Sequence, residues 1–161
     1  VGALAGVRKR ERAMVLGAGG TAPAVVIGLV ALGAQHVTVV ARNTAKAAAL
    51  VDLAVRSGAD AGWVDINDVH LRDAAAGVDV MVNTVPADAV APYASTLATS
   101  PVLLDAIYDP WPTPLAASVH AAGGKVISGL EMLLHQAFAQ VELFTGLPAP
   151  EEAMRAALEQ P

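Results

Sequence analysis

The sequence predicts an α/β fold in which helices cover both faces of a doubly wound, parallel β-sheet. Short apolar runs alternate along the chain with longer helical segments, and the links between them are short. Hydrophobic residues make up 55% of the 161 residues, against 16% charged and 4% aromatic. This composition suits Ala-, Val- and Leu-rich strands that are buried between helices, and the length suits one domain, residues 1–161.

The order of the elements follows from the apolar runs and the helical patterns. Strands are expected at 13–16, 37–41, 61–64, 78–83, 101–106 and 125–127. Helices are expected at 21–33, 43–57, near 69–76, near 89–98, at 113–122, near 130–145 and at 151–159. A strand, a helix and a further strand in succession form a right-handed parallel unit, and such sheets bind ligands at the carboxyl ends of their strands.

The first strand runs into a glycine-rich turn, Gly17-Ala18-Gly19-Gly20-Thr21, and an apolar helix follows it directly. The first glycine allows a tight turn, the next lets the backbone approach a pyrophosphate, and the small Ala22 lets the helix pack close to the strand. Free N–H groups and the positive helix end attract an anion there. The turn therefore predicts a dinucleotide site in a Rossmann-like fold; the alternative is an ordinary glycine-rich turn that binds nothing.

Several classes of protein are disfavoured by the sequence. The stretch 13–34 is uncharged, but glycines and Pro23 interrupt its first half, which indicates a strand, a turn and a helix rather than a membrane span. The opening residues lack the features of a signal peptide, and a cytoplasmic location is expected. The net charge of −5 does not favour nucleic acid or an anionic membrane as partner, and no metal site is expected, because the chain has no cysteine and its histidines lack ligand spacing.

The end of the second strand discriminates between the two nicotinamide dinucleotides. An NAD site normally places an Asp or Glu there, which accepts a hydrogen bond from the ribose 2′-hydroxyl. This chain instead has Arg42 and Lys46, one helical turn apart, where the 2′-phosphate of NADP would lie. A guanidinium suits a phosphate dianion, so NADP is the predicted cofactor. The alternative is that both cations only solvate the start of a helix, where they would oppose the helix dipole.

Three further clusters fall where strands are expected to end. They are Asn83-Thr84-Val85-Pro86, the proline-rich segment 105–114, and the helix start Gly129-Leu130-Glu131-Met132-Leu133-Leu134-His135-Gln136. Thr113 is expected to cap the helix that begins at Pro114, and Gly146 to end a helix in the left-handed conformation. On spacing alone Gln136 is either a ligand contact or an ordinary exposed helix residue. Helical spacing also places Leu133, Ala137, Val141 and Phe144 on one face.

Together these motifs resemble the C-terminal, NADP-binding domain of shikimate dehydrogenases, in the actinobacterial, mycobacterium-like form. The shared motifs are Gly-Ala-Gly-Gly-Thr-Ala at 17–22, Ala-Arg-Asn-Thr at 41–44, Asn-Thr-Val-Pro at 83–86, Asp-x-x-Tyr-x-Pro-x-x-Thr-Pro-Leu at 105–115, Gly-x-x-Met-Leu-x-x-Gln at 129–136 and Phe-Thr-Gly at 144–146. Members of this family reversibly oxidise the 3-hydroxyl of shikimate with NADP, in the pathway to aromatic amino acids. The resemblance implies the same activity here.

The resemblance also implies a role for each matching residue. Residues Gly17, Ala18, Gly19, Gly20 and Thr21 would hold the pyrophosphate, and Arg42, Asn43 and Lys46 would form the 2′-phosphate segment. Thr84 and Val85 would lie beneath the cofactor, Ala106 and Gly129 would line the nicotinamide pocket, and Tyr108 and Gln136 would reach the substrate. Many members have Asn-Arg-Thr at 41–43 and Arg at 46. Lys46 loses the bidentate geometry, so a looser phosphate clamp is expected.

The resemblance further implies that this sequence is one half of an enzyme. The catalytic Lys and Asp of the family belong to an N-terminal substrate domain with no counterpart here, and the opening Val1-Gly2-Ala3-Leu4 resembles the tail of the family signature Asn-Thr-Asp-x-x-Gly. No catalytic residue is expected in this chain, because no sequence context joins its four histidines to a carboxylate relay. The chain is expected to bind NADP without efficient catalysis.

Two alternatives remain open at this point. One is a quinate/shikimate dehydrogenase domain that prefers NAD, which Arg42 disfavours. The other is a free-standing dinucleotide-binding module with a sensing or scaffold role, which a substrate domain encoded upstream would exclude.

Overall fold

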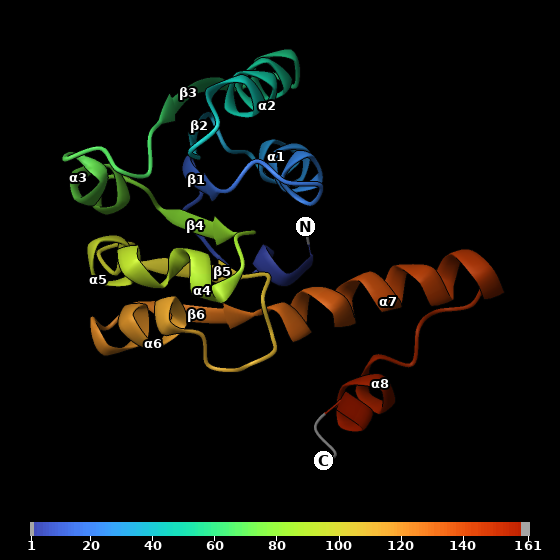
Figure 1. The fold of residues 1–161 in the computed structure, drawn as a ribbon. Coiled ribbons are helices and arrows are strands. Elements are labelled where there is room, and N and C mark those ends of the chain that lie inside the picture. The colour runs from blue at the N-terminus through green and yellow to red at the C-terminus, as the bar shows by residue number, and fades with distance from the viewer. Residues whose placement is uncertain (1, 159–161) are drawn as a thin grey trace.

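Six short strands rich in Val, Leu and Met form one parallel sheet in the computed structural model, which describes residues 2–158 (Figure 1). The strands are β1 (Arg12–Leu16), β2 (His36–Val40), β3 (Asp60–Val64), β4 (Val80–Asn83), β5 (Val102–Asp105) and β6 (Lys125–Ser128). Their order in the sheet is β3-β2-β1-β4-β5-β6, and every neighbouring pair is parallel. The strand order reverses between β1 and β4, the place where such sheets bind ligands.

Alternate residues of the central strands face two separate hydrophobic cores. Val15 of β1 belongs to the core beneath η1 (Gly2–Leu4), α1 (Ala22–Ala31) and α2 (Thr44–Arg56), whereas Met14 and Leu16 belong to the opposite core. The opposite core is covered by α3 (Leu71–Ala76), α4 (Ala87–Val90), η2 (Ala91–Tyr93), α5 (Ala94–Leu97) and α6 (Pro114–Ala121). Because helices cover both faces, strand residues are apolar on both sides, as the composition indicates.

The predicted fold class is confirmed, and each expected element lies within one to three residues of its predicted place. The segment expected as one helix near 89–98 is divided into α4, η2 and α5, and Pro92, which has no N–H to donate, lies in the 3-10 turn. Residue 159, where the last predicted helix ends, and Val1 lie outside the described residues. No helix of residues 2–158 combines the length and apolar character needed to cross a membrane, and the uncharged stretch 13–34 holds β1, a turn and α1.

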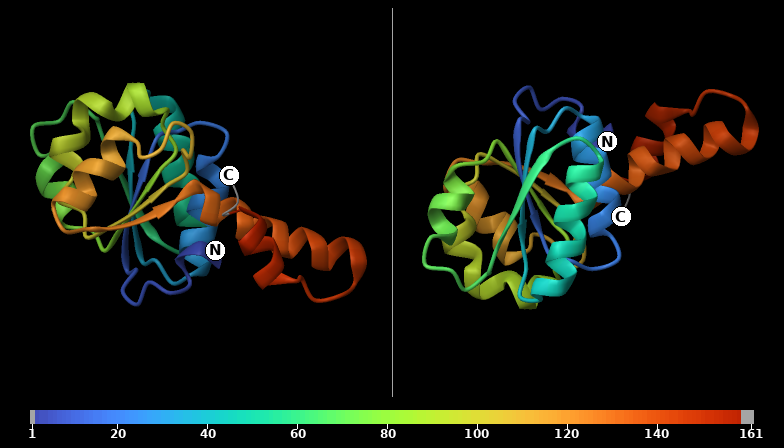
Figure 2. Two further views of the ribbon diagram at one scale, coloured as in Figure 1. Left: turned by 90° about the horizontal axis from the view of Figure 1, so that it is seen from below. Right: turned by 90° about the horizontal axis from the view of Figure 1, so that it is seen from above.

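The last two helices extend beyond the sheet. Figure 2 shows α7 (Gly129–Thr145) leaving the carboxyl end of β6 and α8 (Glu151–Leu158) folding back beside it, where Arg155 pairs with Glu131. Gly146 ends α7 with φ +68°, as predicted. The buried residues of α7 beyond its first are Leu134 and Phe138, whereas Phe144 is 86% exposed. Of the residues expected on one face, Leu133, Ala137 and Val141 are partly buried and Phe144 is exposed, because α7 has left the body of the domain before its last turns.

The Asp79 side chain, directly before β4, forms a hydrogen bond with the start of β1. Its carboxylate accepts a hydrogen bond from the backbone N–H of Arg12 at 2.9 Å and pairs with the Lys9 ammonium at 3.1 Å, and its side chain is 9% exposed. Burial by itself raises the pKa of this carboxyl. The N–H of Arg12 and the charges of Lys9 and Arg12 outweigh that effect, so the pKa of Asp79 lies below its ordinary value.

Asp79→Asn is expected to lower the free energy of unfolding by about 1 kcal/mol at neutral pH, because the Arg12 N–H and Lys9 lose a charged acceptor. A lowered pKa means that the ionised group stabilises the folded state above the pKa of the unfolded chain. That stabilisation disappears as the pH falls through the pKa of the folded state. Urea unfolding of both proteins at neutral pH and below pH 4 measures this difference. A difference that stays constant over that range would show that the charge of Asp79 contributes nothing.

Candidate functional site

The residues predicted for binding gather at one edge of the sheet. Because all six strands are parallel, their carboxyl ends meet there. Gly17 follows β1, Arg42 lies two residues after β2, Thr84 follows β4, Ala106 follows β5, and Gly129 directly follows β6. Five segments that are far apart in the sequence thus meet at one edge.

A cleft of about 250 Å³ lies at this edge, on both sides of the point where the strand order reverses. We call it the strand-end cleft. It is lined by Gly17, Ala18, Gly19, Val40, Ala41, Arg42, Asn43, Lys46, Ile66, Thr84, Val85, Pro86 and Ala89. The glycine turn, the cationic segment after β2 and the turn after β4 therefore face the same space.

The glycines of the turn after β1 serve different purposes. Gly17 has φ +98°, and a Cβ atom there would lie 2.7 Å from Thr84 Oγ1 and 2.9 Å from Val85 Cγ2. Both the backbone conformation and the close neighbours therefore require glycine at 17. A Cβ atom at Gly19 or Gly20 would meet no atom within 4 Å. The protein's own packing does not require these two glycines, and they leave room for a ligand to approach the backbone.

Helix α1 starts directly behind this turn, where the N–H of Ala22 donates to Gly19 O at 3.2 Å and Pro23 has no N–H. Thr21, at the N-cap, makes no side-chain capping bond, whereas Asn43 caps α2 and Thr113 caps α6. Ala22 is fully buried where α1 begins against the strands, which fits the predicted need for a small residue. The start of a helix carries positive partial charge, so the backbone of the turn and the N-terminal end of α1 together suit an anion.

Two cationic side chains border the strand-end cleft beside the turn. Arg42 and Lys46 are exposed, and neither forms an ion pair within residues 2–158. The Asn43 side chain accepts a hydrogen bond from Lys46 N at 2.9 Å, which fixes the start of α2. No Asp or Glu of residues 2–158 lines the cleft. The cleft therefore has positive charge that no carboxylate of its lining offsets.

The turn after β4 lies directly under the glycine turn. Thr84 donates from both its backbone N–H and its hydroxyl to Leu16 O, at 3.0 and 2.7 Å. These bonds hold Thr84 against the end of β1, where it and Val85 occupy the space that a side chain at 17 would need. Thr84 and Val85 thus form part of the floor of the strand-end cleft.

A buried polar network joins the ends of β4, β5 and the start of α6. The Asp105 carboxylate accepts from Asn83 Nδ2 at 2.9 Å, from Ile107 N at 3.1 Å and from Thr113 Oγ1 at 2.5 Å. Asn83, Asp105 and Thr113 are fully buried, and Thr113 Oγ1 accepts from Ala116 N at 3.0 Å, the predicted cap of α6. Three donors thus satisfy a carboxylate that burial would otherwise destabilise.

From the sequence, Asn83, Asp105 and Thr113 were expected at strand and helix ends, but the hydrogen bonds between them were not predicted. A polar residue closing each of two neighbouring apolar strands, at Asn83 and Asp105, is the signal that could have indicated them. The register pairs these two residues directly.

Ala106 and Gly129 lie against each other next to this network. Ala106 N donates to Asn83 O at 2.9 Å, and a Cβ atom at Gly129 would collide with the Ala106 carbonyl. Only glycine at 129 therefore lets α7 begin this close to the end of β5.

The two predicted substrate residues do not line the same hollow. Gln136 lines a second, mostly apolar hollow of about 400 Å³ between α1, α7 and η1, with Thr21, Met132 and His135 among its other residues. Tyr108 lies outside this hollow and outside the strand-end cleft, and it is 46% exposed. Thr21 borders the hollow and Gly17 to Gly19 border the cleft, so the glycine turn separates the two spaces.

Two models of known protein families together match most of the chain. Residues 3–91 match the family model for shikimate/quinate 5-dehydrogenase, and residues 129–159 match the model for the shikimate 5′-dehydrogenase C-terminal domain. The chain belongs to the shikimate/quinate 5-dehydrogenase family. The family resemblance of the sequence motifs is thereby confirmed.

Relatives and solved structures agree with this assignment. A shikimate dehydrogenase (NADP(+)) of Dehalococcoides mccartyi is 35% identical over 153 residues, which cover 90% of this chain and 53% of that protein. The shikimate dehydrogenase structure from Mycobacterium tuberculosis is 62% identical with a TM-score of 0.92, covering 98% of this chain and 59% of that one. That of the Mycobacterium fortuitum shikimate 5-dehydrogenase is 61% identical with a TM-score of 0.93, covering 97% and 57%. The chain spans about half the length of these relatives.

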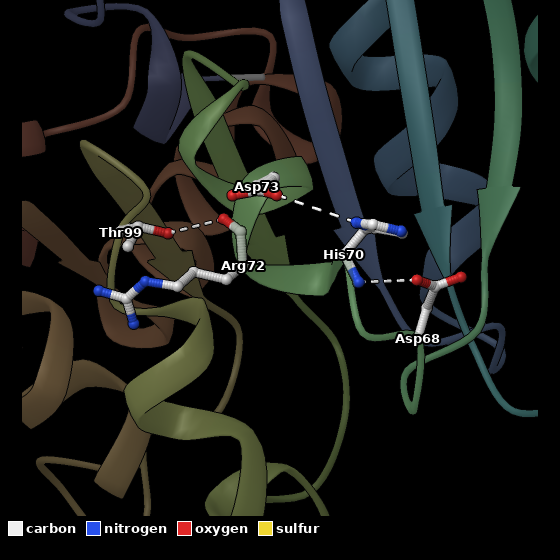
Figure 3. A network of polar contacts seen from close by, with 5 residues as sticks. All are labelled: Asp68, His70, Arg72, Asp73 and Thr99. Carbon is white, nitrogen blue, oxygen red and sulfur yellow. Dashed lines mark hydrogen bonds and ion pairs between the residues drawn. The ribbon is translucent and has the colours of Figure 1, made fainter.

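Two histidines of this family member have carboxylate neighbours that the sequence did not indicate. His70 Nδ1 lies 4.0 Å from Asp73 Oδ2 on α3, with side chains 80% and 86% exposed (Figure 3). His36 Nδ1 lies 3.5 Å from Asp60 Oδ2, and both side chains are also exposed. Such solvated pairs contribute little energy and do not fix an imidazole.

The other two hydrogen bonds drawn in Figure 3 involve the backbone at the start of α3. The His70 backbone N–H donates to Asp68 Oδ1 at 2.8 Å, and Thr99 Oγ1 donates to Arg72 O at 3.2 Å. Within residues 2–158 no group of three His, Asp or Glu side chains is placed to hold a metal ion.

Proposed function

We propose that this chain is the NADP-binding domain of a shikimate dehydrogenase and that the strand-end cleft receives the phosphates of the cofactor. The observation that carries the proposal is the pairing of an open glycine turn with Arg42 and Lys46, in a cleft that no carboxylate of the described residues lines. A carboxylate at the end of β2 would favour NAD, and none is present there. This absence also disfavours the alternative of an NAD-preferring quinate/shikimate dehydrogenase.

The proposed roles follow the geometry of the cleft. The backbone of Gly17, Ala18, Gly19, Gly20 and Thr21 binds the pyrophosphate at the start of α1, and the segment of Arg42, Asn43 and Lys46 binds the 2′-phosphate. Thr84 and Val85 support the cofactor from below. Ala106 and Gly129, held by the Asn83–Asp105–Thr113 network, border the nicotinamide. When bound, NADP supplies the hydride acceptor for oxidation of a secondary alcohol.

The substrate half of the reaction is proposed to require groups beyond this domain. Tyr108 and Gln136 orient shikimate from the α7 side, and the acid–base pair that removes the hydroxyl proton comes from a substrate domain. This assignment places the enzyme in aromatic amino-acid biosynthesis, in the cytoplasm. The alternative of a free-standing sensor or scaffold module predicts dinucleotide binding without any gain of turnover when a substrate domain is supplied.

Arg42→Ala is expected to weaken NADP binding about ten- to hundredfold while leaving NAD binding within about twofold. The change removes a charge-assisted bond to the 2′-phosphate, which NAD lacks. Calorimetric titration of both cofactors measures this change in preference. Arg56→Ala, the same charge change at the far end of α2, is the matched control and should alter neither affinity. Equal losses of NADP and NAD in Arg42→Ala would refute the role of Arg42 in recognising the phosphate.

A further inference from the structure

The indole of Trp63 bonds to the residue directly before Arg42. Trp63 Nε1 donates to Ala41 O at 3.0 Å, although the two residues are 22 positions apart. Trp63 stands opposite Val39 in the parallel register of β2 and β3, so its side chain lies on the same face as Val39, which packs in the core beneath α1 and α2. It is 36% exposed. An aromatic side chain on an edge strand thus reaches across to the end of the neighbouring strand.

This bond adds to the main-chain hydrogen bonds at the end of β2, where Val40 O accepts from Gly17 N at 2.8 Å. The register of β2 with β3 ends at Val40, and beyond it the Ala41 N–H donates to Val64 O over a longer distance of 3.3 Å. Ala41 is only 7% exposed, and the Trp63 indole is a protein partner of its carbonyl oxygen. The peptide between Ala41 and Arg42 is thereby held to β3.

The position of Arg42 depends on this backbone. Its guanidinium is exposed and forms no ion pair within the described chain, so no charged side chain orients it. On the far side of Arg42, the Asn43 cap of α2 fixes the chain through Lys46 N. Arg42 therefore stands between two fixed points, the Trp63 bond at Ala41 and the cap at Asn43.

We propose that Trp63 is a positioning residue that sets the preference for NADP over NAD by holding the Ala41–Arg42 peptide in place. The inference rests on the proposed binding of the 2′-phosphate by Arg42. Trp63 acts through Arg42, and NAD has a neutral hydroxyl where NADP has the 2′-phosphate. Loss of the indole N–H therefore changes the affinity for NADP and leaves the affinity for NAD nearly unchanged.

Trp63→Phe keeps an aromatic ring and removes the donor. The expected result is NADP binding about three- to tenfold weaker, the effect of one net hydrogen bond, with NAD binding within twofold and a similar melting temperature. Replacing Trp63 with its benzothiophene analogue, in which sulfur takes the place of the N–H, should give the same result with less change in packing. Trp111→Phe is the matched control, since the Trp111 indole makes no hydrogen bond within residues 2–158.

A double-mutant cycle with Arg42→Ala separates positioning from general stabilisation. In the Arg42→Ala background, Trp63→Phe should cause no further loss of NADP affinity, because the group it positions is absent. Additive losses, equal losses for NADP and NAD, or an unchanged NADP affinity in Trp63→Phe would each overturn the inference. A wild-type chain that binds neither dinucleotide would refute the proposed function itself, and the role of Trp63 with it.

Discussion

Replacing Gly19 with Val is expected to abolish binding of both NADP and NAD by a chain that remains folded. The site of the new side chain is open, because a Cβ atom at Gly19 would meet no protein atom within 4 Å, and φ at this residue is not in the left-handed range. The branched side chain would instead occupy the space in which the pyrophosphate approaches the backbone. A loss of affinity of more than about a hundredfold is expected for either cofactor, since both carry the pyrophosphate.

The measurement is calorimetric titration with each cofactor beside a thermal melt. Gly6→Val is the matched control, because a Cβ atom there also meets nothing within 4 Å and Gly6 lies outside the strand-end cleft. Gly17→Val provides the contrast, since its positive φ and its contacts with Thr84 and Val85 should lower the melting temperature itself. A folded Gly19→Val chain that still bound NADP would show that this turn does not hold the pyrophosphate.

The fold was predictable because local pattern and overall topology agree. Apolar runs such as Met14–Leu16 are apolar on both faces, which fits strands covered by helices on both sides. Capping residues, such as Thr113 at the start of α6 and Gly146 at the end of α7, act through bonds or conformations within a few positions, which a single sequence displays. Parallel topology then placed the turns after β1, β2 and β4 at one edge.

The contacts that the sequence could not predict join residues distant along the chain. Asn83 and Asp105 are 22 positions apart, as are Ala41 and Trp63. The polar residues that close β4 and β5 hint at the first bond, whereas nothing local reveals the second. The buried face of α7 was also missed, since helical spacing defines several faces and only the surroundings decide which one is covered. For the same reason the sequence could not show that Gln136 lines a hollow that Tyr108 does not border.

The 161-residue chain by itself is expected to bind NADP but to leave it unreduced at saturating shikimate. Oxidation of the hydroxyl needs a base at the reacting oxygen and a substrate held against the nicotinamide. Correct positioning and acid–base catalysis together supply at least about 10⁴-fold in rate. Gln136 has no titratable group, Tyr108 lies outside both hollows, and the exposed His36 and His70 are not fixed in orientation.

Adding the substrate domain, in trans or as the full-length enzyme, should restore turnover, measured as the rise in absorbance of the reduced cofactor. In the full-length enzyme, Gln136→Ala should raise the KM for shikimate at least about tenfold, the effect of losing a hydrogen bond to the substrate, and leave NADP affinity unchanged. Turnover by the isolated chain at an ordinary enzymatic rate would refute the proposal that the acid–base pair comes from a substrate domain. His135, which lines the same hollow as Gln136, would then be the first acid–base candidate to replace, since its ring is held edge-on to Phe138 at 5.5 Å between centroids.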